Sequence, residues 1–195
     1  MPGRPVATAG PQPQAGAYTP VPSHSPGETA AEAMPFFEVS LPKFVVMSVA
    51  TFGIYNLYWA YQQWVHISAR GRESISPFWR AFFSPIWSFS LFERIKVDAS
   101  TRGIAVYWSP GVLGFAYLIM GVLYRLPDPY WLVSLLSFLP LVPAVRAVIA
   151  IHERSTGARD RNGSFGAANV VGIIVGVGFL LLIIAAMASE PQQLE

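Results

Sequence analysis

Residues 167–187 read AANVVGIIVGVGFLLLIIAAM and contain no charged side chain. A helix rises 1.5 Å per residue, so it needs about 20 mainly apolar residues to cross the hydrocarbon core of a bilayer, which is ~30 Å thick. This stretch therefore predicts a transmembrane helix and places the chain among membrane proteins.

The composition of the whole chain agrees with that prediction. Of the 195 residues, 53% are hydrophobic and 12% are charged, whereas soluble domains carry about 25% charged residues. Residues 1–35 hold eight of the seventeen prolines and almost no large aliphatic side chains. We expect them to form a disordered Pro/Ala-rich tail, because too little apolar surface is available to offset the entropy of ordering. Residues 36–189 then form a helical membrane domain, and residues 190–195 form a short tail.

Three other stretches are long and apolar enough to span a bilayer: residues 44–64, 106–126 and 130–151. The expected fold is therefore all-α, a multi-pass transmembrane helical bundle of about four spans. Gly53 and Asn56 interrupt the first of these stretches, so a re-entrant path is the alternative for residues 44–64.

Residues 77–92 form a fifth apolar stretch that is rich in aromatic side chains. Ser76 and Pro77 are typical of a helix N-terminus. The resulting helix would measure about 24 Å, short of a full span, and Pro85 would bend it. We expect an interfacial or re-entrant helix here.

The distribution of basic residues favours that interpretation. If residues 77–92 do not cross, ten of the thirteen bases lie on one side of the membrane, as the positive-inside rule requires of the cytoplasmic side. Both termini are then expected to be extracytoplasmic. The three bases on the other side would be Arg4, Lys43 and Arg125.

A few residues of the spans are candidates for a function or for helix packing. Asn56 and Arg146 would be intramembrane polar residues, which make contacts between helices or line a transport path. Arg146 could also extend its long side chain to the interface. Gly172 and Gly176 form a G-x-x-x-G pair, which lets two helices approach closely.

Basic residues flank the aromatic stretch and form a candidate surface for anionic lipid headgroups. Alternatively, they only set the topology of the chain. They are Arg70, Arg72, Arg80, Arg94, Lys96 and Arg102.

Sequence signals of catalysis are missing. The chain has no cysteine, its histidines lack metal-ligand spacing, and the four predicted spans contain neither Asp nor Glu. We therefore expect no enzyme activity, no cofactor or metal, and no nucleic-acid partner. The lack of intramembrane carboxylates also argues against proton-coupled transport.

The run TFGIYNLYWAY at residues 51–61 resembles the signature of a bacterial membrane family known as domain of unknown function 4234. The residues that match its T-x-G-I-Y-x-x-Y-W pattern are Thr51, Gly53, Ile54, Tyr55, Tyr58 and Trp59. The resemblance covers about a third of the chain, near residues 36–102. It implies an uncharacterised protein of the bacterial inner membrane and assigns no activity.

Two function classes remain open from the sequence. The first is a non-enzymatic scaffold that modulates a membrane partner or assembles with copies of itself. The alternative is a small oligomeric transporter or channel, with Asn56 and Arg146 lining its path.

Overall fold

The computed structural model describes residues 36–71, 74–128, 130–157 and 162–189. Every regular element within these ranges is a helix, which confirms the expected all-α class. The tails predicted at 1–35 and 190–195 lie outside the described residues.

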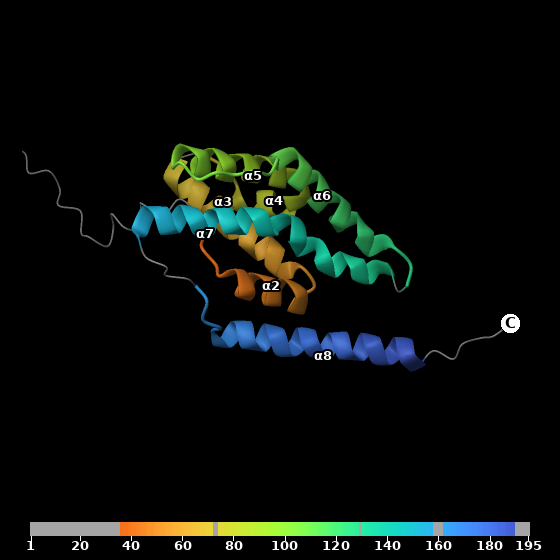
Figure 1. Ribbon diagram of the computed structural model, residues 1–195. Helices are drawn as coiled ribbons and strands as arrows, with labels where there is room; N and C mark the ends of the chain where they lie inside the picture. Colours follow the sequence, from red (N-terminus) through yellow and green to blue (C-terminus); the bar gives the residue numbers. More distant parts are fainter. Residues whose placement is uncertain (1–35, 72–73, 129, 158–161, 190–195) are drawn as a thin grey trace, which may run out of the picture.

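The first two helices of the described part form a helical hairpin, made of α2 (Leu41–Ala50) and α3 (Ile54–Gly71). Between them, Phe52 and Gly53 adopt positive φ angles of 52° and 83°, which reverse the direction of the chain. The N–H of Phe37 donates to Oε1 of Gln63 at 3.1 Å, and Nε2 of Gln63 donates to the carbonyl of Phe37 at 2.8 Å. Residues 37 and 63 therefore lie side by side, which joins the segment before α2 to the middle of α3. Figure 1 shows the two helices of the hairpin.

This hairpin corrects the prediction of one span over residues 44–64. The apolar run is real, but its break at Gly53 turns it back on itself. The break at Gly53 is thus the point where the chain turns back.

The aromatic stretch is also divided into two helices. Helix α4 (Pro77–Phe82) ends just before Phe83, and α5 (Ser84–Thr101) begins with Ser84 and Pro85. The bend expected at Pro85 is thus present. Helix α5 runs on past residue 92 and carries four charged side chains in its second half, namely Glu93, Arg94, Lys96 and Asp98.

The stretch predicted to span at residues 106–126 is helical over only part of its length. Residues 103–109 form a non-helical strap, and α6 (Pro110–Val122) with a 3-10 turn, η1 (Leu123–Arg125), follows it. Pro110 sets this start because proline suits the first turn of a helix. The helical part is too short to count as a candidate span.

Two helices in the described residues are long and apolar enough to cross a membrane, Tyr130–Thr156 and Ala167–Ala186. The first consists of η2 (Tyr130–Leu141) and α7 (Val142–Thr156), which meet where Pro140 and Pro143 interrupt regular α-helical bonding. The second lies in α8 (Ala167–Ser189). The structure thus shows two candidate spans, where the sequence predicted about four.

The core lies between the hairpin, α5 and α7. Its largest fully buried side chains include Trp59, Trp64, Phe92 and Ile151. Helix α8 lies outside this core, and its main contact among the described elements is with α2 (Figure 1). Only 6% of its apolar window is buried, whereas the core helix of a soluble protein would be mostly buried. A bilayer accounts for so much exposed apolar surface better than water does.

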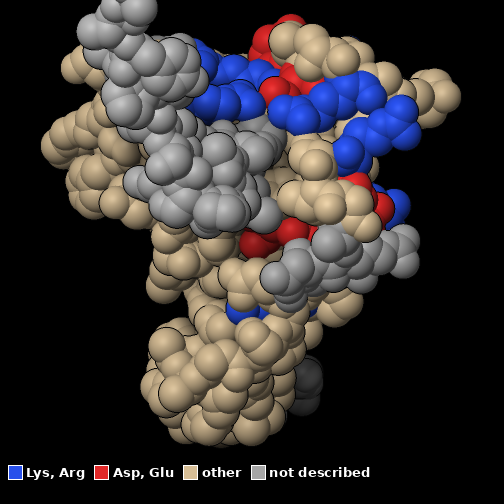
Figure 2. Space-filling model, turned by 90° about the vertical axis from the view of Figure 1, so that its left-hand side faces the viewer, with Lys and Arg blue, Asp and Glu red and all other residues tan. Residues whose placement is uncertain are grey.

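Charged side chains collect at one end of the molecule, which we call the charged end. It comprises the ends of α3, α5 and α7 with Arg70, Asp98, Arg102 and His152. Figure 2 views the molecule from this side and shows Lys, Arg, Asp and Glu around its upper part, whereas α8 at the bottom is free of them.

Candidate functional site

A groove with a mixed polar and apolar lining lies at the tip of the α2–α3 hairpin. It encloses about 370 Å³ between the hairpin, α5, α6 and η2. Its polar lining consists of uncharged hydrogen-bonding groups: Asn56, Ser84, Tyr117, Tyr124, Ser134 and Ser137.

Asn56 is the most deeply buried of these side chains, with 2% of its surface exposed. Its Nδ2 donates to Oγ of Ser137 at 3.3 Å, and its Oδ1 has no partner among the described residues. Ser84 and Tyr117 share a hydrogen bond of 3.2 Å across the same groove. The groove therefore offers uncharged hydrogen-bonding groups and supplies no charged acid or base.

The turn that positions Asn56 is built by residues of the T-x-G-I-Y-x-x-Y-W motif. Thr51 Oγ1 accepts the N–H of Tyr55 at 2.9 Å, and so satisfies an amide in the first turn of α3. Gly53 supplies a positive φ that glycine tolerates at no steric cost. Tyr55 and Trp59 are buried, whereas Ile54 and Tyr58 are exposed. The motif therefore has a structural explanation as the tip and inner face of the hairpin.

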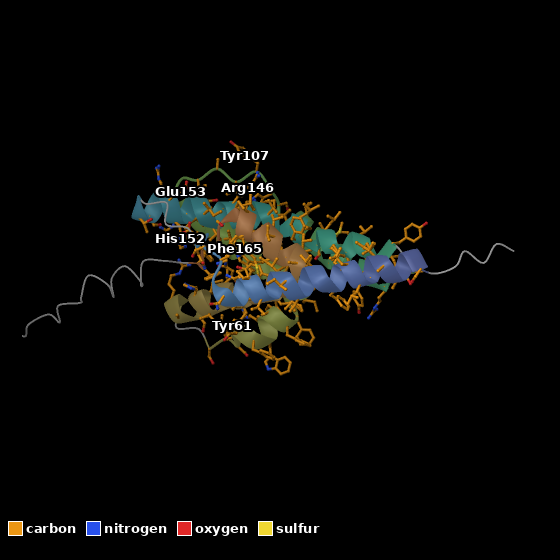
Figure 3. The ribbon with its side chains drawn as sticks, turned by 90° about the horizontal axis from the view of Figure 1, so that it is seen from below. Tyr61, Tyr107, Arg146, His152, Glu153 and Phe165 are labelled. Atoms are coloured by element: carbon orange, nitrogen blue, oxygen red, sulfur yellow. The ribbon has the colours of Figure 1, made fainter. Side chains whose placement is uncertain are left out.

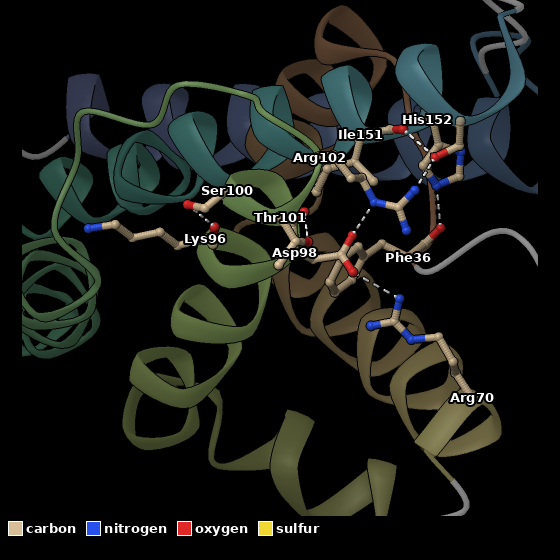
Figure 4. A network of polar contacts seen from close by, with 10 residues as sticks. Phe36, Arg70, Lys96, Asp98, Ser100, Thr101, Arg102, Ile151 and His152 are labelled. Atoms are coloured by element: carbon tan, nitrogen blue, oxygen red, sulfur yellow. Dashed lines mark hydrogen bonds and ion pairs between the residues drawn. The ribbon is translucent and has the colours of Figure 1, made fainter.

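A network of ion pairs joins three helices at the charged end (Figure 4). Asp98 accepts from Nη1 of Arg70 at 3.1 Å and from Nε of Arg102 at 2.8 Å. Arg102 also donates to Oγ of Ser155 at 2.7 Å. Arg70 and Arg102, two of the predicted headgroup contacts, therefore link α3, α5 and α7 through Asp98.

The buried ring of His152 connects the same end to the start of the described chain. Its Nε2 lies 2.6 Å from the carbonyl oxygen of Phe36, and its Nδ1 lies 3.2 Å from a carboxylate oxygen of Glu38. These contacts fix residues 36–38 against α7.

The other predicted headgroup residues differ in their surroundings. The guanidinium of Arg80 lies 4.5 Å from the ring centre of Trp64 and 4.4 Å from that of Trp87, and that of Arg94 lies 5.9 Å from Trp64. These are cation–π distances. Lys96 points away from the Asp98 network (Figure 4). Arg72 lies outside the part of the chain that the structure describes.

Arg146 does not meet Asn56 in one site. It lines a separate groove of about 430 Å³ between α7 and the strap, whereas Asn56 lines the groove at the hairpin tip. The structure thus separates the two residues that the sequence grouped as lining a single path.

Gly172 and Gly176 face α2. A Cβ at Gly172 would contact Met47 and Thr51 in ordinary packing, whereas a Cβ at Gly176 would overlap the carbonyl oxygen of Ala50. The pair therefore packs α8 within the molecule. Phe52 and Phe179 extend this contact, with ring centres 5.4 Å apart.

Lys43 is a residue whose role the sequence did not reveal. Its side chain is 4% exposed, and its Nζ donates to Oδ1 of Asn162 at 2.7 Å and to the carbonyl of Ser164 at 2.9 Å. It thereby ties the start of α2 to the segment before α8. A lysine in an otherwise apolar helix is the one signal of this, and it cannot name partners that lie more than a hundred residues away.

Within the described ranges, no group of three or more His, Cys, Asp and Glu side chains could hold a metal ion. Comparison of the chain with protein-family models, curated proteins and solved structures finds no match. The resemblance of residues 51–59 to domain of unknown function 4234 rests on its motif alone.

Proposed function

We propose that this chain is a non-enzymatic protein of the bacterial inner membrane, and that it acts by holding a partner transmembrane helix against α8. The observation that carries this proposal is the uneven surface of α8, which packs on α2 through its Gly172–Gly176 edge and leaves most of its other large side chains exposed.

The outward face of α8 has the shape of a helix-packing surface. Gly178 is surrounded by large side chains that are about 60% exposed or more. A Cβ added to Gly178 itself would meet open space. A small residue at the centre of such a stripe lets a second helix come close, and van der Waals packing of this kind drives helix association in lipid. The surrounding residues are Val171, Ile174, Val175, Leu181 and Leu182.

The proposed topology places the charged end in the cytoplasm, because Arg70, Arg102 and Arg154 lie there and Arg125 lies toward the other end. The hairpin begins and ends at the charged end, so residues 36–40 are proposed to be cytoplasmic. Helix α8 then ends on the extracytoplasmic side. This proposal replaces the expectation that both termini are extracytoplasmic.

A photocrosslinking experiment tests the partner surface directly. Because the chain has no cysteine, a single Ile174→Cys variant can carry a photoreactive maleimide in native membranes. Val112→Cys on α6 is the matched control, since Val112 is 67% exposed and Ile174 is 66% exposed. We expect a discrete protein adduct from position 174 and only lipid adducts from position 112.

The mass of the adduct distinguishes a second copy of this chain from another protein. Adding Gly178→Val to the Ile174→Cys chain should remove the adduct, because the valine side chain would prevent the partner helix from approaching closely at Gly178. Equal adducts at positions 174 and 112, or none at 174, would contradict the proposed surface.

A second candidate function is the passage of small neutral molecules, and the buried Oδ1 of Asn56 favours it. Its test is the glycerol permeability of proteoliposomes. Asn56→Leu should lower the permeability, whereas Asn169→Leu, the same exchange outside the groove, should not. If permeability equals that of protein-free liposomes, this candidate is wrong.

A further inference from the structure

The groove beside Arg146 lies on a different part of the molecule from α8 and from the Asn56 groove. One wall is the strap, from Ile104 to Trp108, and the other is the first half of α7, from Val142 to Ala150. The strap runs along the top of Figure 1 and α8 along the bottom. A ligand here would therefore act independently of the proposed partner surface.

Charge is concentrated in a single residue of this groove. Among the residues that line it, Arg146 alone is charged, and the others are aliphatic or aromatic. Arg146 is exposed and makes no hydrogen bond or ion pair with the described residues. No carboxylate lines the groove, so the guanidinium would attract an anion that entered it.

The position of Arg146 along α7 suits the boundary between headgroups and acyl chains. Glu153 and Arg154 follow near the end of the helix, and Figure 3 shows Glu153 closer to the charged end. Seven residues of helix separate Arg146 from Glu153, which is about 10 Å. The headgroup region of one leaflet is roughly 5–8 Å thick. A residue at this depth reaches lipid phosphates with its long side chain.

The strap supplies aromatic side chains close to Arg146, at the proposed boundary between headgroups and acyl chains. Tyr107 is 97% exposed, and it lies on the same side of the molecule as Arg146 (Figure 3). Trp108 follows it in the groove wall. Tyrosine and tryptophan favour the membrane–water interface, where an apolar ring and a polar tip are both accommodated.

From the lone cation in an apolar groove we propose that the strap and α7 bind one anionic phospholipid, with its phosphate on Arg146 and an acyl chain along the groove. The apolar walls decide between a lipid and a free phosphate ion. The apolar walls make no favourable contact with a phosphate ion, whereas they remove an acyl chain from water along its length.

Lipid binding to the purified full-length chain tests this site. The chain is incubated in nonionic detergent with phosphatidylglycerol or phosphatidylcholine, and bound lipids are counted by native mass spectrometry. We expect preferential binding of phosphatidylglycerol. Arg146→Gln should weaken that binding roughly tenfold, since a hydrogen-bonded charge pair of about 1.5 kcal/mol corresponds to that factor.

Two further variants control for general charge and for folding. Arg154→Gln removes an exposed arginine from the same helix and should leave the preference intact. Ala150→Leu keeps Arg146 and fills the groove, so it should weaken binding even if Arg146→Gln fails to fold. Free glycerol phosphate should not displace the lipid at equal concentration.

Three results would overturn the proposal. The first is equal binding of the two lipids by the unmodified chain. The second is an equal loss in Arg146→Gln and Arg154→Gln, which would indicate a diffuse basic surface. The third is displacement of the lipid by glycerol phosphate, which would identify a free anion as the ligand.

Discussion

Asp98 holds two arginines of different helices with a single carboxylate. Its side chain is 14% exposed, and those of Arg70 and Arg102 are 41% and 30% exposed. Water screens such pairs in part, so their contribution is closer to that of a surface ion pair than to that of a buried one. The network nevertheless joins three helices, because it connects α3 with α5 and, through Ser155, with α7. A single surface ion pair would join only two.

The network predicts the effect of Asp98→Asn. Loss of the carboxylate should leave Arg70 and Arg102 facing each other without a counter-charge, at a cost of about 1 kcal/mol in the free energy of unfolding. The measurement is urea-induced unfolding in mild detergent at low and at high salt. The loss should shrink at high salt because salt screens exposed charges.

Glu93→Gln provides the matched control on the same helix. Glu93 is exposed, and the ion pairs of Asp98 are made with Arg70 and Arg102, so neutralising Glu93 should change the free energy of unfolding by less than half as much. An equal loss from both variants would show that the Asp98 network contributes no more than overall charge does.

For the helices, the sequence predicted that a segment is helical better than it predicted where the chain turns. Apolar composition identified residues 167–187 correctly as one helix, because no breaker and no distant contact interferes there. The same composition was misleading over residues 44–64, since a hairpin in a membrane domain is as apolar as a span. Gly53 is a visible break in the apolar run. The direction of the returning chain depends on the pairing of Gln63 with Phe37, two residues that lie far apart in the sequence.

The separation of the two grooves shows the same limitation. Asn56 and Arg146 were both recognised as unusual polar residues in apolar segments. Their neighbours could not be predicted, because the strap folds back over α7 through contacts between distant parts of the chain. Composition therefore identifies such residues, whereas tertiary packing decides which of them share a site.

The packing of α8 on α2 leads to a prediction about two glycines. A side chain at Gly176 would overlap the carbonyl oxygen of Ala50, whereas Gly178 faces open space. Gly176→Val should therefore separate the helices or destabilise the fold by about 1–3 kcal/mol. Gly178→Val should leave the isolated molecule as stable as before.

Proteolysis and thermal unfolding in detergent measure this difference. Cleavage near residues 162–166 should become faster in Gly176→Val, as α8 loses its contact with the hairpin. The packing described for α8 would be refuted if both valine variants behaved alike.

In the whole molecule, the hairpin brings the start of the described chain to the same end as the ends of α3, α5 and α7. Residues 36–40 contact α7 through Phe36 and His152, and they contact α3 through Phe37 and Gln63. The start of the hairpin and the ends of α3, α5 and α7 therefore all lie at the charged end. The turn at Asp128 lies at the opposite end of the long helical segments.

In the proposed topology, the hairpin enters the membrane and returns to the side from which it entered. Single cysteines at Ser40, Gly71, Thr101 and Asp128 can be labelled with a membrane-impermeant maleimide, applied to intact cells and to inverted membrane vesicles. We predict that the first three positions react from the cytoplasmic side and that position 128 reacts from the other. Reaction of positions 40 and 71 from opposite sides would contradict the proposed topology.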